Sequence, residues 1–207
     1  MSTDRIAYLA LGDSYTIGEG VAEADRWPAQ LARTLRAEGI ALDDPRVIAT
    51  TGWTTDELAA ALDAAEPMGE YGFVSLAVGV NNQYRGRSAE SYRVEFMALL
   101  ERAIGYAGGR TDRVLVLSIP DWGVTRFGMA SGRDRVEIAQ ELDAYNAAAA
   151  EVCARRGVAF VDIAPISRAR GAEDAMLAED GLHPSAAMYT EWTALALPAV
   201  RGLLHRE

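Results

Sequence analysis

The stretch that decides the fold is Ile6-Ala7-Tyr8-Leu9-Ala10-Leu11-Gly12-Asp13-Ser14-Tyr15, close to the start of the chain. Its first six residues form an apolar run without polar alternation, which is typical of a strand buried on both faces in a parallel sheet. Gly12 then permits a tight backbone path, and Asp13 and Ser14 follow it directly. The stretch therefore predicts a buried strand with polar side chains at its carboxyl end.

The same pattern recurs along the chain. Further short runs rich in Val, Ile, Leu and Ala cover residues 46–50, 73–78, 113–119 and 158–161. Amphipathic stretches alternate with these runs and predict helices over residues 28–38, 55–65, 89–106, 135–156 and 184–204. Pro198 is expected to kink or interrupt the last helix, because proline removes a helical hydrogen bond.

Strand–helix alternation repeated five times predicts an α/β protein. We expect a three-layer α/β/α sandwich with a flavodoxin-like five-stranded parallel sheet in the order 2-1-3-4-5. No long linker, repeat or block of like charge interrupts the sequence, so residues 1–207 are expected to form a single catalytic domain. Ligands of such sheets bind beyond the carboxyl ends of the strands, which is where the chemically interesting residues should lie.

The composition excludes several classes of partner. The formal net charge is −10, with 20 basic and 30 acidic residues. Such a surface repels phosphate backbones and anionic lipid, so we expect no nucleic-acid or membrane partner. A single cysteine, Cys153, allows no intramolecular disulfide and no cysteine-based metal cluster, and neither a metal nor an organic cofactor is expected.

The start of the chain as given predicts a cytoplasmic location. Residues 1–5 carry no basic region followed by a long apolar stretch, and the apolar run over residues 6–11 is too short for a signal peptide or a membrane span. The sequence gives no indication of the oligomeric state.

One serine, one histidine and one aspartate predict nucleophilic catalysis. Of the two histidines, His205 lies near the end of the chain, which leaves His183 as the general base available near neutral pH. Asp180 precedes it by three residues and can orient the imidazole within a turn. A serine hydroxyl needs such a base to become nucleophilic. Each residue alone fits a cap or a turn, but their coincidence favours the set Ser14, His183 and Asp180.

Acyl transfer also needs hydrogen-bond donors for the oxyanion. The N–H groups of Ser14 and Gly52 and the side-chain amide of Asn81 are the candidates, although Gly52 and Asn81 are ordinary turn residues when taken singly. Four aromatic residues near these positions are predicted to line an acyl or aryl pocket: Tyr15, Trp53, Tyr84 and Trp122. Packing in the core explains Trp53 and Trp122 equally well. Residues 122–135 show little pattern and form either a flap over the site or a surface loop.

Together these blocks resemble the SGNH hydrolases, also called the GDSL-like lipase/esterase family. The resemblance runs from Gly12 to Ser185, in the family's order, through these blocks: Gly12-Asp13-Ser14-Tyr15, Gly52, Gly79-Val80-Asn81-Asn82 and Asp180-Gly181-Leu182-His183-Pro184. It implies that Ser14 is the nucleophile and that His183 is the base oriented by Asp180. It also implies that Ser14, Gly52 and Asn81 form the oxyanion hole.

Two positions depart from the family pattern. The usual leucine after the nucleophile is Tyr15, which changes the packing beside Ser14. The third block commonly ends in aspartate, whereas Asn82 stands here, and we expect that residue to support its loop rather than to take part in the chemistry.

The expected function is a serine esterase for small to medium acyl esters, with a small-molecule ester as its partner. Three alternatives stay open on the sequence. They are an acyltransferase or deacetylase acting on sugar or alcohol esters with the same residues, a non-catalytic flavodoxin-like binding domain, and a catalytically inactive homologue.

Overall fold

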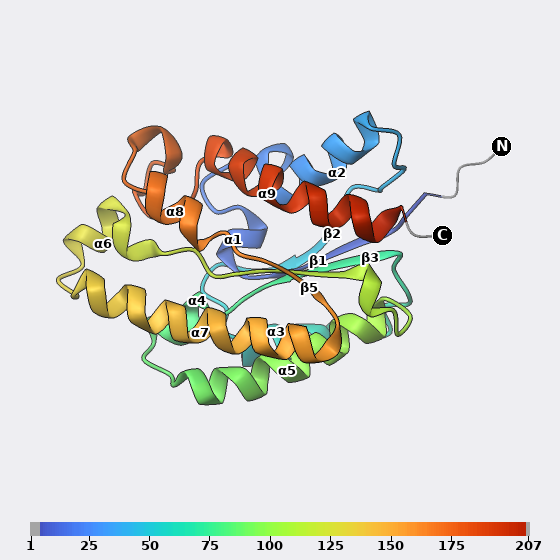
Figure 1. Cartoon of the computed structure of the whole chain (residues 1–207), viewed down its shortest axis with the longest axis horizontal. Helices are drawn as coiled ribbons and strands as arrows, with labels where there is room; N and C mark the ends of the chain where they lie inside the picture. Colours follow the sequence, from blue (N-terminus) through green and yellow to red (C-terminus); the bar gives the residue numbers. More distant parts are fainter. Residues whose placement is uncertain (1–4, 206–207) are drawn as a thin grey trace.

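Five parallel strands form the central layer of the protein, shown here in a computed structural model that describes residues 5–205 (Figure 1). The strands are β1 (Tyr8–Gly12), β2 (Arg46–Ala49), β3 (Phe73–Ala77), β4 (Val114–Leu117) and β5 (Ala159–Val161). Their order across the sheet is β2-β1-β3-β4-β5, and every pair is parallel. The predicted order 2-1-3-4-5 is therefore confirmed.

Strand β1 has a neighbour on each side, which explains its unbroken apolar run. Leu11 pairs with Ile48 of β2 and with Leu76 of β3, and all five residues of the strand are buried. Both faces are covered by helices, so no position along β1 favours a polar side chain. Between β1 and β3 the chain connections leave in opposite directions, and this is the point of such a sheet at which a ligand site opens.

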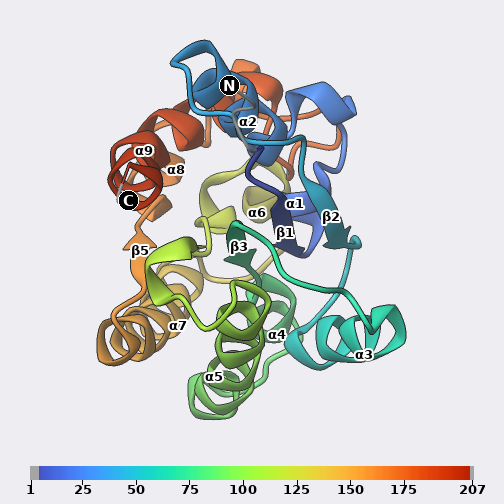
Figure 2. The same cartoon turned by 90° about the vertical axis from the view of Figure 1, so that its right-hand side faces the viewer.

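The long helices cover both faces of the sheet (Figures 1 and 2). One face carries α2 (Trp27–Ala37) and α9 (Ala186–Leu204), which pack against each other, and the other carries α3 (Thr55–Ala65), α5 (Ala89–Tyr106) and α7 (Arg135–Arg156). These five helices confirm the predicted segments within two residues at each end. They complete the three-layer sandwich.

Helix α9 continues through Pro198, so the expected interruption does not occur. Buried residues lie on both sides of the proline, including Trp192, Ala196 and Val200, and the helix packs along its length on α2. A proline inside a helix costs about 3 kcal/mol. Burial of the apolar residues on both sides of Pro198 outweighs that cost.

Several short helical segments were not predicted. They are α1 (Ser14–Ile17), α4 (Val80–Tyr84), α6 (Arg126–Ala130), α8 (Ala164–Arg170) and the 3-10 turns η1 (Glu23–Asp25), η2 (Thr111–Arg113), η3 (Trp122–Val124) and η4 (Asp174–Met176). Each spans two turns or fewer, too few for a hydrophobic period to stand out. Two of them begin just beyond the carboxyl ends of β1 and β3, and so they set the direction of the side chains that follow these strands.

No helix in residues 5–205 is both long and apolar enough to cross a membrane.

Candidate active site

Ser14 is held at the carboxyl end of β1 as the first residue of α1. Asp13 caps this short helix, its Oδ1 accepting a hydrogen bond of 3.0 Å from the backbone N–H of Tyr15. Gly12 allows the close fold of α1 on the sheet, because a Cβ there would lie 2.2 Å from Oγ1 of Thr16 and 2.4 Å from the carbonyl oxygen of Ala77. Any residue with a Cβ would therefore clash at this position.

The segment before α9 joins Asp180 to His183 by two contacts. Asp180 Oδ2 lies 2.5 Å from Nδ1 of the imidazole, and Oδ1 accepts hydrogen bonds from the backbone N–H groups of Leu182 and His183. Partial burial opposes ionisation of Asp180, but these hydrogen bonds outweigh it and lower the pKa of the carboxyl group. The carboxylate thus fixes the imidazole with Nδ1 as donor, which leaves Nε2 as the basic nitrogen.

Ser14 and His183 border one cavity of about 210 Å³ at the carboxyl edge of the sheet. The described residues that line it are Ser14, Tyr15, Thr51, Gly52, Val80, Asn81, Tyr84, Trp122, Phe127, Leu182 and His183. Within residues 5–205 no hydrogen bond joins the Ser14 hydroxyl to the imidazole. Such a bond commonly tightens only when substrate is bound.

Three hydrogen-bond donors lie around this cavity. The Ser14 N–H is at the first position of α1, where a helix leaves its N–H groups without an intrahelical partner. Gly52 has a φ of 89°, a conformation that favours glycine, and in the described chain its N–H makes no hydrogen bond. Asn81 donates one side-chain N–H to the carbonyl oxygen of Trp53 at 2.9 Å, which leaves its second N–H available.

Asn82, which stands where the family has aspartate, faces away from the cavity and is fully buried. Its Oδ1 accepts a hydrogen bond of 3.0 Å from the backbone N–H of Thr55, and its Nδ2 donates to Thr55 Oγ1 at 2.6 Å and to Glu95 Oε2 at 3.2 Å. Asn82 therefore links α4 to the start of α3 and to α5, a supporting role.

Aromatic rings form one wall of the cavity. Trp122 donates its indole N–H to Gln83 Oε1 at 2.9 Å, and the guanidinium of Arg133 lies 5.7 Å from its ring centre. The rings of Tyr84 and Phe127 lie 5.4 Å and 6.0 Å from that of Trp122. Trp122 is thereby fixed in place, whereas Tyr84 is half exposed at the rim.

The cavity differs from the predicted set of pocket residues in two ways. Tyr15, Tyr84 and Trp122 border it, but Trp53 does not; the Trp53 ring packs against the core and only its carbonyl oxygen reaches Asn81. Phe127 was not predicted, because it lies in the stretch without pattern. Leu182 could have been found from its place between Asp180 and His183.

Residues 122–135 form η3 and α6 and are tied to the loop that carries the histidine. The Phe127 N–H donates to the carbonyl oxygen of Gly181 at 3.0 Å, and Arg126 pairs with Asp174. Thr125 caps α6 through the N–H of Gly128. The segment that carries Phe127 is thus connected to the segment that carries His183.

No group of three His, Cys, Asp or Glu side chains in residues 5–205 is arranged to hold a metal ion. The reactive groups on the cavity are the hydroxyl of Ser14 and the imidazole of His183. Together with the available N–H groups they form an arrangement suited to acyl transfer.

The sequence was also compared with known protein families and with curated proteins. The model of the GDSL-like Lipase/Acylhydrolase family matches residues 10–190. No curated protein matches the chain.

Solved structures of similar fold cover nearly the whole chain. TesA is 21% identical, with 95% of this chain and 99% of TesA covered at a TM-score of 0.75. The psychrotrophic esterase EstA from Pseudoalteromonas sp. is 15% identical, with 97% and 99% covered at a TM-score of 0.72. A mutant of Axe2, an acetyl xylan esterase from Geobacillus stearothermophilus, is 17% identical, with 94% of each chain covered at a TM-score of 0.71. At these identities the likeness is one of fold.

Proposed function

The chain belongs to the GDSL-like lipase/acylhydrolase family, and on this premise we propose that it is a serine esterase that hydrolyses small to medium acyl esters through Ser14. The observation that carries the proposal is the contact of 2.5 Å between Asp180 Oδ2 and His183 Nδ1, with His183 and Ser14 on the same cavity. Family membership supports ester hydrolysis, and this geometry supports the roles of the three residues.

In the first half of the reaction, Nε2 of His183 takes the proton of the Ser14 hydroxyl as Oγ attacks the ester carbonyl carbon. Asp180 stabilises the imidazolium that forms and holds it in the productive tautomer. The imidazolium then returns its proton to the departing alkoxide. The products of this half are a free alcohol and an acyl group on Ser14.

The tetrahedral intermediate carries a negative charge on the former carbonyl oxygen. The N–H groups of Ser14 and Gly52 and the second N–H of Asn81 are the donors that stabilise it. Gly52 and Asn81 both line the cavity, and Arg85 and Trp53 hold them there through hydrogen bonds to the Gly52 carbonyl and from the Asn81 amide. In the second half, His183 removes a proton from water, the hydroxide attacks the acyl carbon, and the proton returns to Ser14 Oγ as the acid leaves.

The lining of the cavity favours uncharged esters. No Lys, Arg, Asp or Glu is among the described residues that border it, and the aromatic rings of Tyr84, Trp122 and Phe127 offer an apolar wall. A charged acyl group would lose its hydration there without gaining an ionic partner. Two proteins of similar fold act on esters. Axe2 is an acetyl xylan esterase. EstA is an esterase, and its structure was determined inhibited by monoethylphosphonate.

The experiment is turnover of p-nitrophenyl acetate and butyrate by the wild type and by Ser14→Ala and His183→Ala. Each variant should lose at least about four orders of magnitude in kcat, since the residues of a triad act as a unit. The matched controls are Ser91→Ala and His205→Ala, which change exposed residues that do not line the cavity. Both controls should keep full activity.

Covalent labelling adds an independent readout. A fluorophosphonate should modify the wild type and the two control variants at one site, and Ser14→Ala should remain unlabelled. Turnover that survives in Ser14→Ala, or labelling at another residue, would refute the assignment. Acyl transfer to added glycerol in preference to water would identify an acyltransferase that uses the same site.

A further inference from the structure

Tyr15 is the one described residue that borders three separate cavities at the carboxyl end of the sheet. The first is the reactive cavity of about 210 Å³ that Ser14 and His183 line. The other two, of about 10 Å³ and about 20 Å³, lie deeper in the protein and touch neither Ser14 nor His183. Tyr15 therefore stands between the reactive cavity and two small voids, each with room for no more than about one water molecule.

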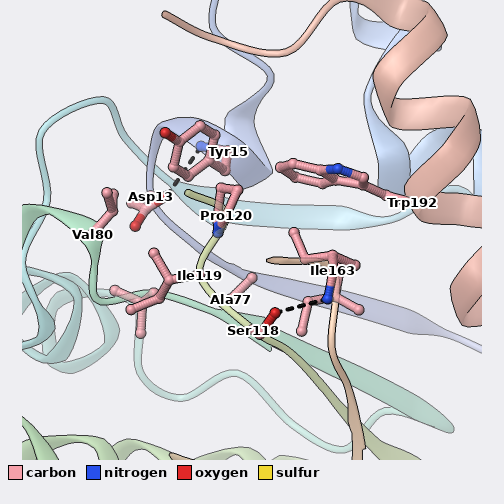
Figure 3. A pocket seen from close by; sticks show the side chains of 11 residues that line it. Asp13, Tyr15, Ala77, Val80, Ser118, Ile119, Pro120, Ile163 and Trp192 are labelled. Atoms are coloured by element: carbon pink, nitrogen blue, oxygen red, sulfur yellow. Dashed lines mark hydrogen bonds between the residues drawn. The ribbon is translucent and has the colours of Figure 1, made fainter. Parts of the chain in front are cut away.

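The space behind Tyr15 is mainly apolar, although Asp13 and Ser118 border the smaller inner cavity and Asp121, Thr125 and Ser167 border the larger one. The smaller inner cavity is lined by residues at or just after the carboxyl ends of β3, β4 and β5, among them Ala77, Leu117, Ile119 and Ile163. Figure 3 shows Ala77, Ile119 and Ile163 beneath the rings of Tyr15 and Trp192. The larger one is lined by several apolar side chains of the segments before and within α9, including Met176, Leu177 and Met188. A hydrocarbon chain that took the place of the Tyr15 ring would therefore meet mainly apolar side chains.

The ring of Tyr15 is fixed between the catalytic histidine and the core. Its centre lies 5.7 Å from that of His183 and 5.9 Å from that of Trp192, both in edge-on arrangements. Its backbone N–H is held by Asp13, and the residue is only 6% exposed. A substrate cannot push this ring aside without breaking contacts on both of its sides.

We propose that Tyr15 is a specificity-determining residue that closes the inner end of the acyl-binding cavity and so restricts the enzyme to short acyl chains. This proposal rests on the function proposed above, because an acyl chain is held in the cavity only if Ser14 is its acceptor. The physical reason is steric. The ring itself fills the space that a longer chain would need beyond the reactive cavity, and the voids behind it are too small to hold that chain.

Substitution of Tyr15 by a smaller residue should join the cavities. In Tyr15→Ala, and to a smaller extent in Tyr15→Leu, the ratio of kcat/KM for p-nitrophenyl octanoate to that for the acetate should rise by about tenfold or more, as additional methylene groups become buried. Tyr15→Phe keeps the ring and should keep the short-chain preference. The ratio does not depend on the fraction of folded enzyme, and Tyr15→Leu remains testable if Tyr15→Ala unfolds.

Met188 provides the matched control. It borders the larger inner cavity but not the reactive one, and it is not one of the two residues whose rings hold Tyr15, so Met188→Ala enlarges the inner space while Tyr15 still closes it off. This variant should keep the wild-type ratio. An unchanged ratio in Tyr15→Leu and Tyr15→Ala, or an equal rise in Met188→Ala, overturns the proposal.

Labelling of Ser14 by a fluorophosphonate separates this outcome from a failure of the proposed function. If the wild type is labelled at Ser14 and the ratio does not shift, only the role of Tyr15 is wrong. If the wild type is neither labelled nor active on any ester, the proposed function itself is wrong, and the proposal for Tyr15 is overturned with it.

Discussion

The guanidinium of Arg85 donates a hydrogen bond of 2.7 Å from Nη2 to the carbonyl oxygen of Gly52, a residue that lines the reactive cavity. The same nitrogen lies 3.3 Å from Glu57 Oε2 at the start of α3. Arg85 follows α4 directly, four residues after Asn81, whose side chain holds the next carbonyl oxygen, that of Trp53. Asn81 in α4 and Arg85 just after it thus hold the carbonyl groups of two consecutive residues, Trp53 and Gly52.

Removal of this contact should slow the chemical step. In Arg85→Met the peptide that follows Gly52 loses its anchor, which loosens the neighbouring peptide that carries the Gly52 N–H. We expect kcat to fall about tenfold while KM changes less than about twofold, because the proposed oxyanion donor acts mainly in the transition state. Arg85→Lys should recover part of the loss. The matched control is Arg87→Met, since Arg87 pairs with Asp56 and does not contact the loop of Gly52. Equal effects of the two methionine variants would contradict this role.

Asp180→Asn should reduce kcat by less than Ser14→Ala does. In the proposed mechanism the carboxylate orients His183 and stabilises the imidazolium, but the Asp180 side chain is 43% exposed, so water replaces part of its electrostatic effect. We expect a loss of roughly two to three orders of magnitude in kcat, with the fold intact. Steady-state kinetics on p-nitrophenyl acetate, with circular dichroism as the check on folding, measure it. Full activity in Asp180→Asn would show that the contact to His183 is not used.

Replacement of Asn82 by the aspartate that is usual in the family should destabilise this protein. An aspartate cannot donate to Glu95 Oε2, which lies 3.2 Å from the amide nitrogen, and it would bring a second carboxylate into a fully buried position. We expect Asn82→Asp to lower the free energy of unfolding by about 2–4 kcal/mol at pH 7, and by less at pH 5, where the new carboxyl group is more readily protonated.

The double variant Asn82→Asp/Glu95→Gln tests the cause of that loss. The glutamine amide that replaces the Glu95 carboxylate can donate to the new aspartate, so the double variant should be more stable than Asn82→Asp alone. Urea denaturation of the wild type, the two single variants and the double variant gives the coupling energy. Strictly additive effects would show that the two positions do not interact.

Asp13 should make the stability of the protein depend on pH. Burial raises the pKa of its carboxyl group to about 7, against hydrogen bonds from the N–H groups of Tyr15 and Gly79 that favour the ionised form. In the unfolded chain the pKa is about 3.9. Between about pH 4 and pH 7 the folded state therefore binds more protons, and the free energy of unfolding falls as the pH rises, by up to about 1.4 kcal/mol per pH unit from this group.

Asp13→Asn removes this contribution while it keeps an oxygen to accept from Tyr15. The free energy of unfolding of the variant, measured in urea at pH 5 and pH 7, should fall less across this interval than that of the wild type. The same difference between the two pH values in both proteins would place the pKa of Asp13 outside this range.

The sequence alone was sufficient to predict the features that leave a pattern in neighbouring residues. Runs of apolar residues specified five strands, of which β1, β3 and β4 are buried whereas the edge strands β2 and β5 are partly exposed. Amphipathic periods specified five helices, because burial on one face leaves a pattern in consecutive residues. The contact of Asp180 with His183 belongs to the same class, since residues three apart meet within one turn. The order along the chain of the four sequence blocks that resemble the family could likewise be recognised from the sequence.

Tertiary structure decided which distant residues meet. Only the sheet order brings Gly52 to Ser14 and Asn81, and only packing places Arg85 on the Gly52 carbonyl or Tyr15 between three cavities. The place of Phe127 on the cavity was missed for the same reason, whereas the short helices were missed because two turns or fewer show no clear hydrophobic period. The local sequence limits the contacts that a residue can make with its neighbours along the chain. The shape of a cavity, by contrast, depends on all the side chains that pack around it.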